Sequence, residues 1–383
     1  MGSYAAYKLT GMGHEVVVLE QHKQPGEKVC CTGIISQQCV TSFAIDENVI
    51  LRQSNSARLF SPSGRLIRLR REEPQACVVD RAAFDIVMAS RAQAKGAEYL
   101  LNSLVRNLQV EADRVRVEVV RQGERLNLEA RVVVIAAGFG SVLVKRLGLG
   151  KIGDFVMGAQ ATVEAIGIDE VEVYTGQEIA PGFFAWLVPT SPPKAMVGLL
   201  SRHSPGLYLR GLMSSLQAQG KIASDEAKLS YGGIPLRPLA KTYGERLLVV
   251  GDAAGQVKPT TGGGIYYGLL CADIAADTLH QALRNDNLSS KTLANYDREW
   301  RKKLGRELEI DYYARKLYER LSDKQIDRIF NIIKSNNIDQ ALLQAEDLSF
   351  DWQGKVIMRL IRHKVISKTL EAMKLPFSFR KQG

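Results

Sequence analysis

The sequence is poor in the residues that build disulfide frameworks and zinc sites. It holds 5 cysteines and 5 histidines among 383 residues, with no C-x-x-C pair and no H-x-x-x-H pair. We therefore expect no metal, because a zinc site needs such ligands at close spacing. No apolar run approaches the ~20 residues of a membrane-spanning helix, and the N-terminus lacks the basic start and apolar core of a signal peptide. A cytoplasmic location is the default expectation.

The composition is otherwise that of a globular protein with an excess of positive charge. Hydrophobic residues make up 45% and charged residues 24% of the chain, which excludes disorder as its main state. The net charge of +10 indicates an anionic partner, such as nucleic acid, a phosphorylated ligand or an anionic membrane. Nucleic acid is disfavoured because no helix-turn-helix, RNP or zinc-finger signature occurs.

The order of elements predicts an α/β fold with a β-rich insert. We expect a doubly wound, mostly parallel sheet from residues 1–150 and 241–285, interrupted by an antiparallel β domain over residues 151–240. Two strands within residues 57–75 are candidates for the sheet of that insert. Residues 286–383 have a helical and heavily charged pattern, so we expect a C-terminal helical region there.

The first residues match the second half of a dinucleotide-binding motif. Such motifs combine a strand, a G-x-G-x-x-G turn into a helix, and an acid about 20 positions on. Here Gly2 fits the third glycine, a helix over residues 3–9 follows, and a strand that we expect to be buried and parallel ends at Glu20. By analogy about a dozen residues should precede Gly2. Either the start lies upstream of the given sequence or the protein lacks that first strand, and we favour the upstream start. The alternative is a helix–strand unit that merely ends in glutamate.

A glycine-rich stretch after residue 250 carries a stronger signal. Gly251 and Asp252 follow a hydrophobic strand, and Pro259 and the glycine triplet 262–264 lead into a helix that we expect from about residue 264 to residue 284. An acid at the end of a strand can accept a hydrogen bond from a ribose or ribitol hydroxyl. Bare backbone N–H groups at a helix start favour an anion. The pattern indicates a dinucleotide site rather than a simple glycine turn.

With these motifs the chain resembles the geranylgeranyl reductase family, in the flavoprotein class that also contains the aromatic hydroxylases. Residues 251–265 (GDAAGQVKPTTGGGI) match the family's GDAAG…P-x-x-G-x-G-I flavin motif. Residues 181–198 resemble its P-x-x-Y-x-W-x-F-P…V-G motif, with Phe and Val where Tyr and Phe are usual. Residues 28–33 are similar to its K-x-C-G-x-G loop, and residues 79–85 to its V-x-R-x-x-F-D segment.

The resemblance implies a flavoprotein that reduces isoprenoid double bonds by hydride transfer from flavin N5. It implies a first domain that binds FAD and an insert that binds a prenyl lipid, a prenyl diphosphate or another prenylated precursor. In this family the electrons come from NADPH or a reduced ferredoxin, and no second dinucleotide motif for NADPH occurs here. The residues that the resemblance assigns to FAD are Gly2, Glu20, Arg81, the Val105 backbone, Gly251, Asp252, Pro259, Gly262, Gly263, Gly264 and Ile265.

Three residues of the insert and one cysteine are candidates for contact with the substrate. Pro181, Phe184 and Trp186 stand in the motif of the insert, and alternation along a strand places Phe184 and Trp186 on one face. That face is either a pocket wall over the flavin or part of the sheet core. Cys30 lies in the loop over residues 28–33, where a thiol can donate a proton or simply serve as a small buried hydrophobe. We select Cys30 as the catalytic candidate.

Positive charge gathers near the C-terminus. Residues 354–383 contain eight Lys or Arg and one Glu, with apolar residues at helical spacing. This pattern is typical of a membrane-surface helix, or of a terminal helix packed on its own domain with a solvated basic face. Two rival functions also stay open: an FAD-dependent monooxygenase or halogenase on the same scaffold, and a non-enzymatic remnant with a defective nucleotide site.

Overall fold

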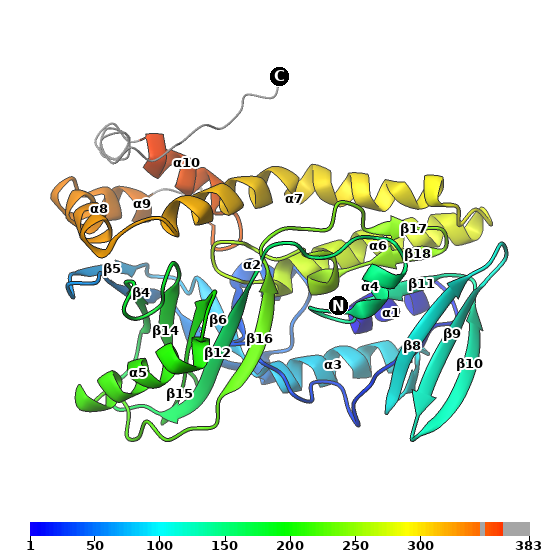
Figure 1. Ribbon diagram of the computed structural model, residues 1–383, viewed down its shortest axis with the longest axis horizontal. Helices are drawn as coiled ribbons and strands as arrows, with labels where there is room; N and C mark the ends of the chain where they lie inside the picture. Colours follow the sequence, from blue (N-terminus) through cyan, green and yellow to red (C-terminus); the bar gives the residue numbers. More distant parts are fainter. Residues whose placement is uncertain (345–348, 363–383) are drawn as a thin grey trace. The chain divides into compact units, whose positions relative to one another are not determined.

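The computed structural model describes residues 1–344 and 349–362, which divide into two units. The first unit comprises residues 1–50, 79–155 and 233–308. The second comprises residues 51–78, 156–232 and the described residues from 309 onward. The elements that carry the chain from one unit to the other are β3 (Ile50–Ser54), β6 (Ala76–Val79), β12 (Phe155–Glu164), β16 (Ser230–Pro235) and α7 (Ser290–Tyr318), labelled in Figure 1.

The first unit contains two parallel strand pairs. β1 (Val17–Leu19) pairs with β7 (Glu98–Leu100), and β11 (Val133–Ile135) pairs with β18 (Leu247–Val249), which also pairs with the antiparallel β17 (Tyr243–Gly244). All three residues of β18 are buried, as its apolar sequence predicts. The prediction of a buried strand before Glu20 was wrong in part. β1 is parallel, but it pairs on one side only among the described residues, and Val17 is 50% exposed.

Three helices of the first unit pack together. α1 (Gly2–Gly11) packs against both α3 (Arg81–Ala94) and α6 (Ile265–Arg284). The small, buried side chains of Ala5 and Ala6 allow α1 to approach its neighbours closely. α3 begins where the Asp80 carboxylate caps it, accepting from the N–H groups of residues 82 and 83 at 3.0 Å each. The shorter elements of this unit are β2 (Ile34–Ser36), α2 (Gln37–Ser42), the 3₁₀ turns Glu47–Val49 and Gly251–Ala254, and α4 (Val142–Arg146).

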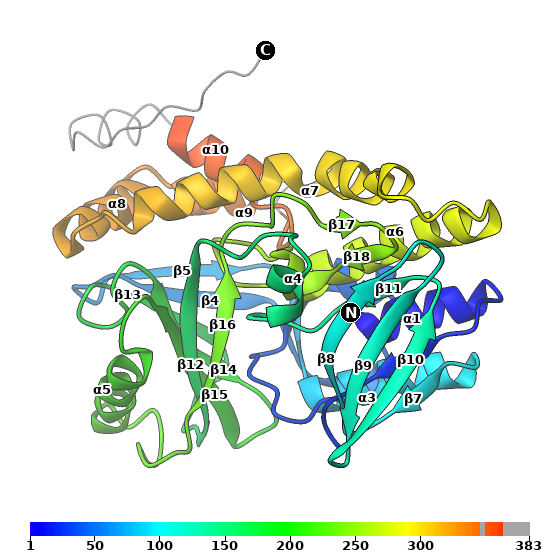
Figure 2. The ribbon, with the colours of Figure 1, turned by 45° about the vertical axis from the view of Figure 1, so that its right-hand side comes forward.

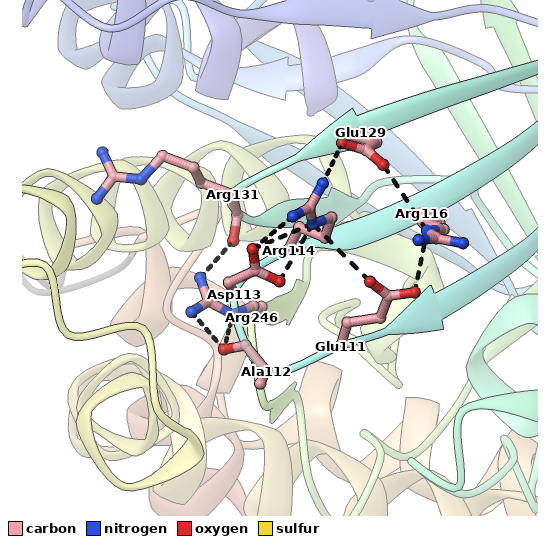
Figure 3. A network of polar contacts seen from close by, with 8 residues as sticks. All are labelled: Glu111, Ala112, Asp113, Arg114, Arg116, Glu129, Arg131 and Arg246. Carbon is pink, nitrogen blue, oxygen red and sulfur yellow. Dashed lines mark hydrogen bonds and ion pairs between the residues drawn. The ribbon is translucent and has the colours of Figure 1, made fainter.

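An antiparallel meander of β8 (Ser103–Val110), β9 (Val115–Arg121) and β10 (Glu124–Ala130) belongs to the first unit (Figure 2). Arg246, just before β18, donates to the Ala112 carbonyl at 2.7 and 3.0 Å and to the Arg131 carbonyl at 3.1 Å. Surface ion pairs among Glu111, Asp113, Arg114, Arg116 and Glu129 lie beside these bonds (Figure 3). Exposed ion pairs contribute little to stability, so the meander is joined to β18 mainly by the bonds from the Arg246 side chain and by the apolar core that Val115, Val117 and Val119 share with β18.

The second unit is organised around a seven-stranded sheet in the order β16-β12-β15-β14-β13-β4-β5. Its other strands are β4 (Ser56–Phe60), β5 (Leu66–Arg70), β13 (Val171–Thr175), β14 (Phe184–Pro189) and β15 (Lys194–Ser201). α5 (Pro205–Ala218) packs on β15, as Figure 1 shows, and encloses an apolar core with alternate residues of the strands. The two strands expected within residues 57–75 are β4 and β5, and β4 pairs in parallel with β13.

Helices follow the sheet in the second unit. α7 ends at Tyr318, and α8 (Asp323–Ser335), α9 (Ile338–Leu343) and α10 (Gly354–Arg362) come after it. A capping box between Ser322 and Gln325 starts α8, whose Ile326 and Phe330 are buried. Among the described residues, no helix is long and apolar enough to cross a membrane. The expected fold class, an α/β fold with an antiparallel-rich insert and a helical C-terminal region, is confirmed.

Candidate functional site

The glycine-rich stretch forms a turn between β18 and α6 that only glycine can make. Gly251 and Gly255 have φ angles of +69° and +75°. A Cβ on Gly255 would lie 2.5 Å from the carbonyl oxygen of Arg237, so backbone conformation and close approach both require glycine there. The single 3₁₀ turn over residues 251–254 ends the strand abruptly. Asp252 is thereby held at the carboxyl end of β18.

Asp252 lies beside the first turn of α6. A Cβ on Gly264 would come within 2.9 Å of Asp252 Oδ1, so this glycine leaves room for the carboxylate. Gly264 is also the N-cap of α6, and no side chain caps the first turn. Burial raises the pKa of Asp252, and nearby positive charge, including Arg81, lowers it in part. An acid and a bare helix start therefore share one small region, which suits a polar ligand with an anionic part.

A closed set of buried hydrogen bonds supports the turn. Gln256 Oε1 accepts from the Gly251 N–H at 2.8 Å, and Gln256 Nε2 donates to the Tyr296 hydroxyl at 2.8 Å. That hydroxyl donates in turn to the Val249 carbonyl at 2.9 Å. Burial raises the pKa of Tyr296 well above its ordinary value, so the hydroxyl keeps its proton. Sequence reasoning missed both side chains, because Tyr296 lies 40 positions beyond Gln256 and belongs to no motif.

Lys258 closes the second half of the loop. Its N–H donates to the Gly263 carbonyl at 3.1 Å, and its carbonyl accepts from the Gly262 N–H at 2.8 Å. Its side chain is buried and runs so close to Gly263 that a Cβ there would lie 2.9 Å from Lys258 Cε. Pro259 and Ile265 are buried on either side of this bend. The sequence analysis did not select Lys258, although it is the one basic residue of the stretch 251–265.

The N-terminal half of the dinucleotide motif lies in the same unit. A Cβ on Gly2 would lie 3.2 Å from Ala136 Cβ, so α1 begins close to the end of β11. The Glu20 carboxylate accepts from the His22 N–H at 2.9 Å and lies 2.8 Å from His22 Nδ1. The Ser103 N–H donates to the Glu20 carbonyl at 2.8 Å. These bonds hold Glu20 where β1 ends.

Arg81 and the cysteine loop lie together at the start of α3. Arg81 makes a bidentate pair with Asp85 at 2.9 and 3.1 Å, and its Nε is buried with no hydrogen-bond partner among the described residues. A Cβ on Gly33 would lie 2.3 Å from the Val79 carbonyl oxygen, so the loop is pressed against β6. Burial would lower the pKa of Arg81, but Asp85 and, to a smaller extent, Cys31 raise it overall. The selected Cys30 is partly buried in the same loop.

Val105 stands at an irregularity of β8. The pairing of β8 with β9 shifts register between Val105 and Asn107, which is the signature of a β-bulge. A bulge leaves a residue of the strand outside the regular ladder and bends the strand locally. The backbone contact expected of Val105 therefore falls where the regular pairing is interrupted.

In the second unit, Phe184 and Trp186 lie on the face of β14 away from α5. The alternate residue Ala185 belongs to the core under α5, and the rings of Phe184 and Trp186 are 5.9 Å apart. Trp186 pairs directly with Gly198 on β15, and a Cβ there would overlap the indole at 2.5 Å. This contact explains why tryptophan and glycine occur together in the motif. Trp186 Nε1 is buried without a hydrogen-bond partner among the described residues.

Helix α7 holds the turn that follows Pro181. Arg315, which is 3% exposed, donates to the Gly182 carbonyl and lies over the Phe183 ring. The Tyr318 hydroxyl donates to the Phe183 carbonyl at 3.1 Å. Sequence reasoning missed Arg315 and Tyr318, which lie over 130 positions away. The residues predicted to bind the cofactor thus lie in the first unit together with Cys30, and Pro181, Phe184 and Trp186 lie in the second.

The sequence is similar to proteins named as reductases and to a cyclase family. The family model described as lycopene cyclase protein matches residues 71–344. A digeranylgeranylglycerophospholipid reductase of Methanocaldococcus jannaschii is 30% identical over 341 residues, which cover 86% of each chain. A reductase of the same name from Methanothermobacter thermautotrophicus is 28% identical over 88% of this chain and 90% of its own.

Solved structures share the fold over nearly the whole chain. A geranylgeranyl bacteriochlorophyll reductase-like protein from Thermoplasma acidophilum has a TM-score of 0.84 at 22% identity, covering 97% of this chain and 96% of its own. A flavin-dependent brominase has a TM-score of 0.71 at 15% identity, with the same coverage of the two chains. At these identities the likeness concerns the fold, and it agrees with the fold class expected from the sequence.

Proposed function

Because the chain belongs to the digeranylgeranylglycerophospholipid reductase family, we propose that it is an FAD-dependent oxidoreductase that reduces isoprenoid double bonds. The observation that carries this proposal is the 30% identity to a named reductase across 86% of both chains. The proposed substrate is a geranylgeranyl-type chain carried by a lipid, a diphosphate or another prenylated precursor, and the names of the relatives favour a lipid.

The residues of the first unit fit FAD. Asp252 supplies a carboxylate for a hydroxyl of the cofactor, and the uncapped start of α6 supplies N–H groups for its anionic part. The buried Nε of Arg81 is a donor that has no acceptor within the part of the chain that the structure describes. The proposed set that holds FAD is Gly2, Glu20, Arg81, the Val105 backbone, Gly251, Asp252, Pro259, Gly262, Gly263, Gly264 and Ile265. Bound FAD would supply the hydride for one carbon of the double bond.

The second unit is proposed to hold the prenyl chain. Phe184 and Trp186 would offer it an apolar face and keep water from the reacting carbon, and Pro181 would shape the turn beside that face. The second carbon of the double bond needs a proton, and Cys30 is the proposed donor because its loop precedes Arg81 in the proposed FAD site. In this division of roles the segments 1–150 and 241–285 serve the cofactor, and the segment 151–240 serves the substrate.

Electron donor and membrane contact belong to the same proposal. The donor is NADPH or a reduced ferredoxin, and the lack of a second dinucleotide motif favours a donor that binds only transiently. The basic stretch 354–383 is proposed to contact a lipid surface, because a prenyl-lipid substrate of the enzyme would come from such a surface. Of that stretch the structure describes α10, whose Leu360 packs against Ile338. Residues 363–383 lie outside the described residues.

The absorption spectrum of the purified chain is the first test. The visible bands of oxidised flavin should be present after purification or after incubation with FAD. D252N should weaken FAD binding about tenfold or more, because a hydrogen bond to a charged group contributes about 1.5–3 kcal/mol. D277N, at an exposed carboxylate of α6, is the matched control and should bind FAD like the wild type. A folded protein that binds no FAD would refute the proposed cofactor.

The product mass tests the reaction class. The FAD-loaded protein, reduced without oxygen, should add two hydrogens to each double bond of a geranylgeranyl lipid. The match to the lycopene cyclase family makes cyclisation the specific rival, and cyclisation leaves the mass unchanged. A gain of oxygen or halogen in the presence of oxygen would instead support a monooxygenase or halogenase. A product of unchanged mass with a new ring would overturn the reductase.

A further inference from the structure

A buried lysine lies under the glycine loop of the first unit. Lys258 is 3% exposed, and its Nζ lies 3.5 Å from the position of a Cβ on Gly263. Its Nζ also lies 5.8 Å from the centroid of the Tyr267 ring. Lysine is seldom buried to this extent, and its ammonium group carries a positive charge. The flavin motif that the chain matches leaves this position open, so the role of Lys258 needs its own explanation.

Two features direct positive potential at the same stretch of backbone. The first turn of α6 presents its N–H groups at Ile265 without a side-chain cap. The ammonium of Lys258 lies behind the neighbouring Gly263. Away from bulk water, an interaction between charges a few ångströms apart is several times stronger than in water. The acid of the loop, Asp252, lies beside Gly264, whereas the Lys258 side chain lies beside Gly263.

We propose that Lys258 stabilises the reduced, anionic form of FAD relative to the oxidised form and so raises the reduction potential of the bound cofactor. This inference rests on the proposed FAD site. An external donor supplies two electrons and solvent supplies one proton, which convert the neutral flavin ring into a reduced ring with one negative charge. In this proposal Lys258 acts through its electric field and needs no direct contact with the ring.

A mechanical role for the same side chain makes a different prediction. The Lys258 backbone closes the loop through Gly262 and Gly263, and its long side chain fills the space near Tyr267. Methionine keeps those backbone bonds and much of the apolar volume but removes the charge, whereas arginine keeps the charge. Loss of a mechanical support would weaken oxidised and reduced FAD alike. Loss of a charge would change the ratio of the two affinities.

The experiment compares the wild type, K258M and K258R, with K241M as the matched control. Lys241 is an exposed lysine of the same unit. Each protein is loaded with FAD, its melting temperature is recorded, and the midpoint potential is titrated without oxygen against a reference dye. We expect K258M to lose about tenfold of its preference for reduced FAD, which equals about 30 mV for a two-electron couple. K258R and K241M should keep the wild-type potential, and all variants should bind oxidised FAD similarly.

The outcomes separate this inference from the proposed function. A wild-type protein that binds no FAD would refute the FAD site before any variant is made. If the wild type binds FAD and K258M has the same potential, the inference is overturned and the FAD site stands. If K258M binds oxidised and reduced FAD more weakly by the same factor, Lys258 has a mechanical role, and the inference is overturned in this case too. If K258M does not fold, K258Q replaces it, and failure of both to fold also counts as the mechanical result.

Discussion

Helix α7 stabilises one turn in each unit, and the two turns depend on different chemistry. In the first unit, Tyr296 completes a set of neutral hydrogen bonds with Gln256 around Gly251. In the second, Arg315 donates to the Gly182 carbonyl, and Glu319, just beyond the helix, pairs with Arg202. Neutral groups keep their bonds over a wide range of pH, whereas ion pairs change with pH and salt. Low pH or high salt should therefore weaken the ion pair of the second turn and leave the bonds of the first turn unchanged.

The difference follows from what each turn presents to the helix. The turn at Gly251 presents backbone groups and has no room for larger side chains. The side-chain amide of Gln256 and the hydroxyl of Tyr296 are therefore sufficient to pair these groups. The turn at Gly182 presents the face of Phe183, which attracts a cation, and a carbonyl, which accepts from the same guanidinium. The residues of each turn thus determine which kind of partner α7 supplies.

The largest effect on stability is expected when a side chain is added to Gly255 in the first turn. G255A places a Cβ in the left-handed region, which costs about 1–2 kcal/mol, and the overlap with the Arg237 carbonyl adds to that. We expect the free energy of unfolding, measured by urea denaturation, to fall by more than about 2 kcal/mol. G148A is the control, because Gly148 has a φ of +70° with open space around it. Equal losses in the two variants would mean that the close approach at Gly255 has no energetic consequence.

The next largest effect is expected from removing the cation of the second turn. R315M leaves the Gly182 carbonyl without its charged donor, and hydrogen bonds to charged groups contribute about 1.5–3 kcal/mol. We expect a loss of about 2 kcal/mol in unfolding free energy. R320M, at an exposed arginine just past α7, should lose less than about 0.5 kcal/mol. A similar loss in both variants would contradict a specific role for Arg315.

A smaller effect is expected from breaking the neutral bridge. Y296F leaves Gln256 Nε2 and the Val249 carbonyl buried without this partner, which costs about 1–2 kcal/mol. The loss should be the same at pH 5 and pH 7, because no group of the bridge changes its charge there. Y313F, at a tyrosine that is 43% exposed, is the control and should be near neutral. A loss that varies with pH over this range would show that the bridge is not a neutral one.

The smallest effect is expected from the titration of Glu319. Burial would raise the pKa of its carboxyl, but the hydrogen bond and charge of Arg202, with Lys316 and Arg315, lower it overall. A lowered pKa in the folded state means that the stabilisation is present above about pH 4.3 and is lost as the pH falls below it. E319Q should therefore be less stable than the wild type at pH 7, by up to about 1 kcal/mol. The difference should shrink toward pH 3, and a constant difference would rule out this ion pair as its cause.

The cofactor loop could be predicted from the sequence because its requirements are local. Gly251, Gly255 and Gly264 are required by a turn and by close contacts that all lie within fifteen residues. The pattern can therefore be detected in one short segment of the sequence. The strand pairs were also predictable where apolar residues were continuous, as in β18. The strand before Glu20 has the same apolar pattern, yet Val17 is exposed, because burial depends on which strands flank it and not on its own residues.

The supporting residues could not be predicted, because their partners are far away in the chain. Nothing around Tyr296 or Arg315 distinguishes them from other polar residues of a charged helix. Their roles depend on carbonyl groups that only the fold brings near. Lys258 was within the recognised motif, but a motif describes which residue types recur and does not say where a variable side chain goes. Its burial under Gly263 became visible only with the backbone in place.

The interleaving of the two units bears on how the chain folds during synthesis. The first unit needs three segments, and the last of them ends at Leu308. The turn at Gly251 cannot form its bond to Tyr296 until that part of α7 has left the ribosome. Contacts between distant segments also form slowly, because a long loop must close before they contribute. Most of the chain must therefore be made, and kept from aggregation and proteolysis, before the glycine loop takes its final form.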